Sequence, residues 1–212
     1  EFVEQRRISI PTTVIVQTVE DMPYYHLKDK IDSIIGSEEY DNGESNEGRV
    51  FVYYGSLGGL PLNPSWSVDS NQDGANLGSS VSTAGDVNGD GYSDIIIGAD
   101  SYNDQQINAG AAFVFHGSAT GLSPIANWST TIDQIGAGLG YSVSTAGDVN
   151  GDVFSDVIIG APYYDNEDIG EGAVFIYNGS SSGLSTNYSW MAEGNQGGAL
   201  FGNCVSTAGD VN

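Results

Sequence analysis

The chain has 212 residues and a formal net charge of −23, with 28 acidic residues against five lysines and arginines. Such an acidic surface repels nucleic acid and anionic lipid, so neither is expected as a partner. The single cysteine, Cys204, excludes an internal disulfide, and no apolar stretch is long enough to span a membrane, so direct membrane insertion is not expected.

The first thirty residues differ from the rest of the chain. They hold four of the five basic residues and do not match the repeat that follows. Residues 1–30 are therefore left unassigned, as a separate segment, a degenerate part of the repeat array or an artefact of the sequence. Val14–Val19 has the composition of a strand. The start without Met indicates processing or truncation.

From Ile31 onward the chain repeats itself every 62 residues. The octapeptide Val-Ser-Thr-Ala-Gly-Asp-Val-Asn occurs three times at this spacing, beginning at Val81, Val143 and Val205. Self-similarity at a fixed period is the signature of a repeat architecture. The period predicts a partial repeat at 31–76, full repeats at 77–138 and 139–200, and a truncated repeat at 201–212.

Each repeat contains four strand-like segments separated by Gly, Asn, Asp and Ser, which favour turns. In the first full repeat they are Ser79–Ala84, Asp94–Ala99, Gly110–His116 and a stretch around Trp128. The corresponding segments elsewhere are Tyr141–Ala146, Asn203–Ala208, Asp156–Ala161, Gly172–Asn178, Gly48–Tyr54 and the stretches around Trp66 and Trp190. Four short antiparallel strands per repeat predict an all-β fold of β-propeller blades. Helical and leucine-rich repeats fit this pattern less well.

A loop rich in oxygen side chains joins the first two strands of each full repeat. Oxygen side chains stand at positions 1, 3, 5 and 9 and a carbonyl at position 7, given by Asp86, Asn88, Asp90, Asp94 and Tyr92. Ca²⁺ takes six to eight hard oxygen ligands, so the loop predicts a calcium site. Softer metals lack His or Cys ligands here, and Mg²⁺ fits less well. An EF-hand is excluded because position 12 is Ile97, inside a strand.

The second full repeat carries the same loop with one difference. Its predicted ligands are Asp148, Asn150, Asp152, the carbonyl of Phe154, and Asp156. At position 6, however, Val153 replaces Gly91. If that position requires a positive φ, a β-branched residue is strained there, and the second site is expected to bind more weakly.

Two short elements flank each loop. One reads Phe201-Gly202 and, in weaker form, Leu77-Gly78 and Leu139-Gly140; the other reads Gly160-Ala161-Pro162 and Gly98-Ala99-Asp100. Together with the loop, they resemble the FG-GAP repeat of the integrin α-subunit β-propeller and its microbial relatives. The resemblance implies a propeller usually closed by seven blades. About 3.5 blades make an incomplete propeller, so we expect further blades from a longer chain or self-association.

The resemblance also implies a function. It indicates an extracellular module, secreted or at the cell surface, for cell adhesion or ligand binding, with a protein or glycan ligand on the face opposite the calcium loops. Tyr102, Tyr163, Tyr164 and Asp165 lie on loops expected at that face and are the candidate ligand contacts. The alternative is that these side chains only pack and solvate their loops.

Other functions stay open. The chain could be an accessory propeller domain of a secreted polysaccharide-active enzyme, or a glycan-binding lectin. Within the sequence no catalytic constellation stands out, so an enzyme is not expected. His116 is interpreted as an ordinary residue at a strand end, Cys204 as a small buried residue, and the three tryptophans as core or blade-contact residues.

Overall fold

The computed structural model describes residues 15–18, 31–56 and 58–209, and in this part of the chain all regular structure is β-strand. The first sheet, called blade 1, contains β1 (Ile15–Thr18), β2 (Ile31–Ser37), β3 (Arg49–Tyr54) and β4 (Trp66–Asp69). Blade 2 contains β5 (Leu77–Gly85), β6 (Asp94–Ala99), β7 (Ala111–Phe115) and β8 (Trp128–Thr131). Blade 3 contains β9 (Ser142–Gly147), β10 (Asp156–Ala161), β11 (Ala173–Tyr177) and β12 (Trp190–Glu193).

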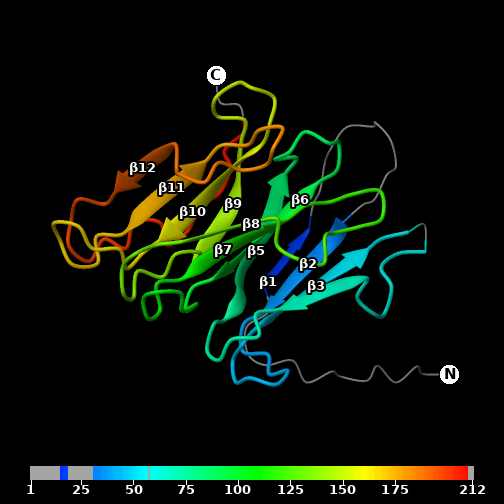
Figure 1. Cartoon of the computed structure of the whole chain (residues 1–212), viewed down its shortest axis with the longest axis horizontal. Helices are drawn as coiled ribbons and strands as arrows, with labels where there is room; N and C mark the ends of the chain where they lie inside the picture. Colours follow the sequence, from blue (N-terminus) through cyan, green and yellow to red (C-terminus); the bar gives the residue numbers. More distant parts are fainter. Residues whose placement is uncertain (1–14, 19–30, 57, 210–212) are drawn as a thin grey trace.

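Each sheet is an antiparallel meander in which every strand pairs with its neighbour in the sequence. The three sheets stand side by side in chain order, and the described residues do not close them into a ring (Figure 1). This confirms the predicted all-β fold of propeller blades and its incompleteness.

Apart from the last one, the predicted strands agree with the structure except at their ends. The second segments are confirmed without change as β6 and β10. The third segments begin one residue later than expected, because Gly110 and Gly172 have φ of 81° and 76°, outside the strand region. The prediction of a strand at Asn203–Ala208 is wrong. No described strand pairs with this segment to provide ladder hydrogen bonds.

Blade 1 extends into the segment left unassigned by the sequence. The expected strand at Val14–Val19 is confirmed as β1, which pairs with β2 from Ile15 opposite Gly36 to Thr18 opposite Ser33. It takes the place in blade 1 that β5 and β9 take in the other two sheets. The division of the chain into domains stays a prediction.

The hydrophobic core lies between neighbouring blades. One cluster joins blade 1 to blade 2 through buried residues such as Val50, Ile95 and Ile97, and another joins blade 2 to blade 3. All six residues of β6 are buried, as expected of an apolar strand covered on both faces. The small residues of β5 are also mostly buried, which confirms a crowded position for the first strand.

A glycine-on-glycine contact explains the two short elements that flank the loops. A Cβ added to Gly98 would lie 1.9 Å from the carbonyl oxygen of Gly140, and a Cβ on Gly160 would lie 2.0 Å from that of Gly202. Gly140, from the Leu-Gly element, therefore contacts Gly98 of the preceding Gly-Ala element. Gly202, from the Phe-Gly element, contacts Gly160 in the same way. Ser80 strengthens the contact by donating to the Gly140 carbonyl at 2.7 Å.

Tryptophan side chains link the blades at another point. Trp66 Nε1 donates to the Ser123 carbonyl at 3.1 Å, and Trp128 Nε1 donates to that of Ser185 at 3.0 Å. Each bond joins one blade to the next, so the interpretation of these residues as blade contacts is confirmed. The interpretation is wrong for Trp190, in the same register on β12, whose side chain is 50% exposed.

The expectation that Cys204 is buried is wrong. Its thiol is exposed, whereas Ser142 and Ser80, one and two periods earlier, donate to the carbonyls of Gly202 and Gly140. Within the described residues no blade follows blade 3, so this position is left uncovered.

Candidate metal-binding loops

The first candidate loop, residues 86–94, joins β5 to β6 and is folded around the carboxylate of Asp86. Oδ1 accepts the backbone N–H of Gly89 at 2.7 Å and that of Asp90 at 3.1 Å. Oδ2 accepts the N–H of Gly91 at 2.8 Å. An Asp at the start of a turn commonly satisfies backbone donors further along the loop in this way. One side chain therefore satisfies three backbone donors of the loop.

The middle of the loop carries the next two predicted ligands. Asn88 Oδ1 accepts the N–H of Asp90 at 3.0 Å, and Asn88 Nδ2 donates to Asp90 Oδ2 at 2.9 Å. Asp90 Oδ1 accepts the N–H of Tyr92 at 2.9 Å. The structure thus brings these polar groups onto one short turn, as the alternating spacing predicts.

Asp94 closes the loop from the first position of β6 and is fully buried. Its two carboxylate oxygens accept the N–H groups of Val87 at 2.9 Å and Gly117 at 2.8 Å. Burial raises the pKa of Asp94 to about 7; the two backbone bonds lower it, and the charges of Asp90 and Asp86 raise it again. A nearby cation would favour the ionised form of such a carboxylate.

The second candidate loop, residues 148–156, repeats this arrangement between β9 and β10. Asp148 accepts the N–H groups of Gly151, Asp152 and Val153 at 2.7, 3.0 and 2.8 Å. Hydrogen bonds chiefly from the Val153 N–H lower the pKa of Asp148. Asp156 is buried and accepts from Val149 and Gly179, and burial raises its pKa. The two loops therefore share the same conformation and the same internal hydrogen bonds.

The donor set of the loops fits a hard cation. An ionised carboxylate has about four acceptor positions; the bonds above occupy three on Asp86 and two on Asp94. Every predicted side-chain ligand of the first loop thus keeps acceptor capacity. Among the described residues, no three Asp, Glu, His or Cys side chains are grouped closely enough to hold a metal ion. Binding would therefore require the loop carboxylates to turn inward.

At position 6 the two loops have different residues but the same backbone conformation. Gly91 has a φ of 87° and Val153 a φ of 74°. The predicted requirement for a positive φ is therefore confirmed, and Val153 is a β-branched residue in a region where such residues are rare. A left-handed conformation costs a non-glycine residue about 1–2 kcal/mol. The side chain of Val153 is 86% exposed, so packing returns little of this cost.

Exchanging the two residues gives a matched pair of variants. We expect Val153→Gly to raise the free energy of unfolding by about 1 kcal/mol and Gly91→Val to lower it by about 1–2 kcal/mol. Nothing lies within 4 Å of a Cβ at Gly91, so the change acts through backbone strain alone. Denaturant unfolding of both variants measures the effect. A stabilised Gly91→Val variant would rule out strain at position 6.

His116 lies beside the first loop, which the sequence did not indicate. Its Nδ1 is 3.3 Å from Asn88 Nδ2, and its Nε2 is buried with no hydrogen-bond partner among the described residues. Burial lowers the pKa of His116, and the charges of Asp90 and Asp86 raise it. The interpretation as an ordinary strand-end residue is therefore incomplete. No local signal could reveal the contact, since Tyr54 and Asn178 occupy this position in the other repeats.

The four candidate ligand contacts on the opposite face differ in how they are held. The rings of Tyr102 and Tyr164 are half-buried, edge-on against Phe113 and Phe175. Tyr163 is 45% exposed, and Asp165 is exposed while its backbone is bonded to Gln134. Packing thus occupies part of the first pair's surface and leaves the second pair more accessible.

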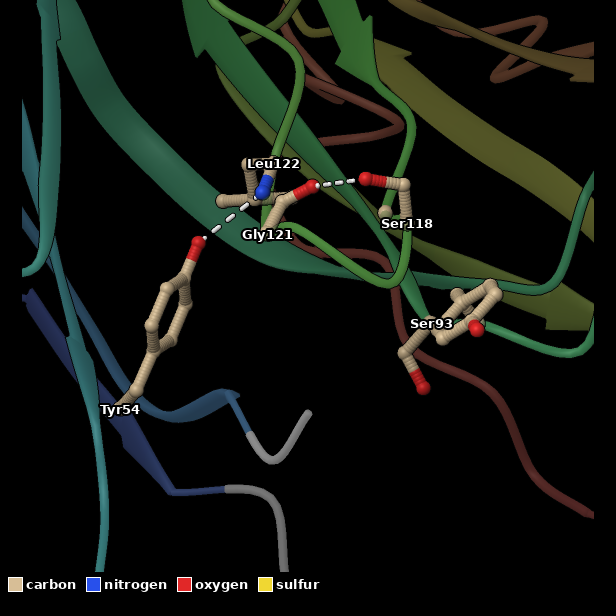
Figure 2. A pocket seen from close by; sticks show the side chains of 7 residues that line it. Tyr54, Ser93, Ser118, Gly121 and Leu122 are labelled. Atoms are coloured by element: carbon tan, nitrogen blue, oxygen red, sulfur yellow. Dashed lines mark hydrogen bonds between the residues drawn. The ribbon is translucent and has the colours of Figure 1, made fainter. Parts of the chain in front are cut away.

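A hollow beside the first loop is too small for a ligand. It lies where Tyr54 reaches from blade 1 and accepts the Leu122 N–H at 3.0 Å, near Ser93 and the turn closed by Ser118 and Gly121 (Figure 2). Tyr92 also lines it. Its volume is about 10 Å³, roughly the space needed by one water molecule. The loops, and not this hollow, are therefore the candidate binding sites on this side of the blades.

Comparison with known proteins agrees with the repeat pattern. Residues 77–115 and 139–177 match the FG-GAP repeat. The chain is 30% identical over 191 residues to integrin alpha-3 of Mus musculus, an alignment covering 88% of this chain and 17% of that protein. It is 29% identical over 172 residues to integrin alpha-4 of Xenopus laevis, covering 79% of this chain and 16% of that protein.

A third relative, integrin alpha-6 of Gallus gallus, is 34% identical over 120 residues, or 55% of this chain and 10% of the relative. The chain therefore spans less than a fifth of the length of these relatives. In the part that the structure describes, no helix is long and apolar enough to cross a membrane.

Proposed function

Because this chain is an integrin-α-like array of FG-GAP repeats, we propose that it is a calcium-binding, non-catalytic propeller module of an extracellular adhesion or ligand-binding protein. The observation that carries the proposal is the duplication of one loop, bond for bond, in blades 2 and 3. A loop with three carboxylates within nine residues is electrostatically costly without a cation, in a chain of net charge −23. Two such loops with the same fold favour a common ligand.

Calcium would be held by the side chains at positions 1, 3, 5 and 9 and the carbonyl at position 7. In the first loop these are Asp86, Asn88, Asp90, Asp94 and Tyr92, and in the second Asp148, Asn150, Asp152, Asp156 and Phe154. A bound cation would neutralise part of the charge and fix the loops between the inner strands of each blade. The role of the metal is therefore structural, and the recognition surface lies elsewhere.

The opposite face offers the surface for a protein ligand. There Tyr163 and Asp165 are accessible, and Gln134 of blade 2 bonds the Asp165 backbone of blade 3 at 2.6 and 2.7 Å. A rigid connection between blades that carries exposed aromatic and acidic side chains suits recognition. The unpacked parts of the Tyr102 and Tyr164 rings add to this recognition surface.

Calorimetric titration of single-loop variants tests the calcium sites. Asp86→Ala and Asp148→Ala should each reduce the number of bound ions from two to one. The ion that remains in Asp86→Ala should bind more weakly, because the intact loop then contains the strained Val153. Equal affinities of the two remaining sites would contradict the ranking, and unchanged ion counts would contradict the sites themselves.

Glycan binding is a second candidate, favoured by one observation. A hollow of about 210 Å³ lies between blades 2 and 3, lined by aromatic and hydroxyl side chains that include Tyr177, Tyr188 and Thr130. Aromatic faces with nearby polar groups are suited to sugar rings. A glycan array with the intact chain separates the two functions: a specific signal lost in Tyr188→Ala favours the lectin.

A further inference from the structure

The two candidate loops contact each other across the boundary between blades 2 and 3. Ser155, at position 8 of the second loop, donates its backbone N–H to the Asp86 carbonyl at 3.0 Å. Its hydroxyl accepts the backbone N–H of Asp86 at 3.1 Å. The first ligand position of the first loop is therefore held on both sides of its backbone by a residue that is not itself a predicted ligand.

Two more contacts extend this connection. The Val87 carbonyl accepts the N–H of Ser180, also in blade 3, at 3.1 Å. The ring of Phe154, whose carbonyl is position 7 of the second loop, lies over Gly89, so that a Cβ on Gly89 would be 2.5 Å from Phe154 Cε1. The first loop thus rests on the residues that form the second.

The second loop has no comparable support among the described residues. Val149 is 54% exposed, whereas Val87, its counterpart in the first loop, is fully buried. Nothing in the described chain lies within 4 Å of a Cβ at Gly151, the counterpart of Gly89. Within the described residues, the first loop is therefore held by contacts from outside that the second loop does not make.

We propose that Ser155 is a positioning residue for the first loop and that calcium in the second loop raises the affinity of the first. This inference rests on the calcium sites proposed above. Binding at 148–156 would order Phe154 and Ser155, and these hold Asp86 and Gly89 in the conformation that the first ion needs. Coupling between two sites is reciprocal, so the first ion raises the affinity of the second by the same factor.

Ser93 provides a matched control for Ser155. It is the same residue at position 8 of the first loop, and its side chain is exposed. In calcium titrations, Ser155→Ala should weaken the tighter site about fivefold, the loss expected from one hydrogen bond. Ser93→Ala should change neither site by more than about twofold. Ser155→Thr keeps the hydroxyl and should restore the wild-type affinity.

A second experiment keeps Ser155 unchanged and alters the second loop instead. Asp148→Ala empties the second loop, and the remaining first site should then bind about fivefold more weakly than the tighter site of the wild type. Hydrogen exchange of the Gly89, Asp90 and Gly91 amides provides an independent readout, since exchange should quicken in both Ser155→Ala and Asp148→Ala. If Ser155→Ala does not fold, the Asp148→Ala arm decides alone.

The outcomes separate this inference from the function on which it rests. A wild-type chain that binds no calcium removes the proposed sites and the inference with them. A wild type that binds two ions, with Ser155→Ala and Asp148→Ala leaving the first site at wild-type affinity, overturns the coupling and leaves the calcium sites intact. A weakened first site in both variants, with Ser93→Ala unchanged, supports it.

Discussion

Gly98→Ala is expected to destabilise the protein by about 3 kcal/mol or more, the upper range for forcing extra atoms into a packed core. The new methyl group would lie 1.9 Å from the Gly140 carbonyl oxygen and 2.3 Å from Ser80 Oγ. The nearer atom belongs to the backbone of blade 3, so the blades would have to move apart. For a chain of this size the thermal midpoint should fall by about 6–12 °C, measured by circular dichroism.

Gly58→Ala is the control for this substitution. The nearest atom to a Cβ added at Gly58 is Ser56 Oγ at 3.6 Å, an ordinary contact. Its effect should stay within about 0.5 kcal/mol. Equal midpoints for Gly98→Ala and Gly58→Ala would show that the blades do not meet through their glycines.

Removing calcium is expected to produce the second large effect. An ion that binds the folded chain alone stabilises it by about 2.7 kcal/mol when its concentration is a hundred times its dissociation constant. Extracellular calcium modules have dissociation constants of about 0.1–1 mM, so 10 mM calcium approaches this regime. Excess chelator should then lower the thermal midpoint by about 5–10 °C from the first loop alone. The second loop adds less, because of the strain at Val153.

The combined Asp86→Ala and Asp148→Ala variant is the control for the chelator experiment. It should unfold at one temperature whether calcium or chelator is present. Magnesium at the same concentration should stabilise the wild type less than calcium, since Mg²⁺ keeps its waters and demands a rigid octahedron. An unchanged wild-type midpoint with chelator would exclude a structural role for calcium.

Much of the fold could be predicted because the sequence of strands and turns repeats at one fixed period. Repetition aligned the strands, and turn residues marked their limits, so β6 and β10 were expected at the residues where they occur. Small residues in the first strand indicated crowding, which the burial of β5 confirms. The error at 203–208 has a physical cause. A strand depends on pairing with a neighbour, and the repeat pattern alone does not supply one.

Contacts between blades could not be predicted, because they join residues about sixty positions apart. The bond from Trp66 to Ser123 and that from Ser155 to Asp86 depend on how two sheets are placed side by side. The exposure of Cys204 has the same cause. The contact of His116 with Asn88 lies within blade 2, but the other repeats carry different residues at that position, so their comparison gave no signal. By contrast, the strain at Val153 followed from comparing two loops in register, and the structure confirms its positive φ.

A crystal structure of the protein grown in millimolar calcium tests the proposed sites most directly. We expect an ion in the loop at 86–94, with oxygen ligands at about 2.3–2.6 Å. The ligands expected are Asp86, Asn88, Asp90, Asp94 and the Tyr92 carbonyl, and the loop at 148–156 should hold a second ion at lower occupancy. Loops that keep their hydrogen bonds and hold no ion at that concentration would contradict the calcium sites.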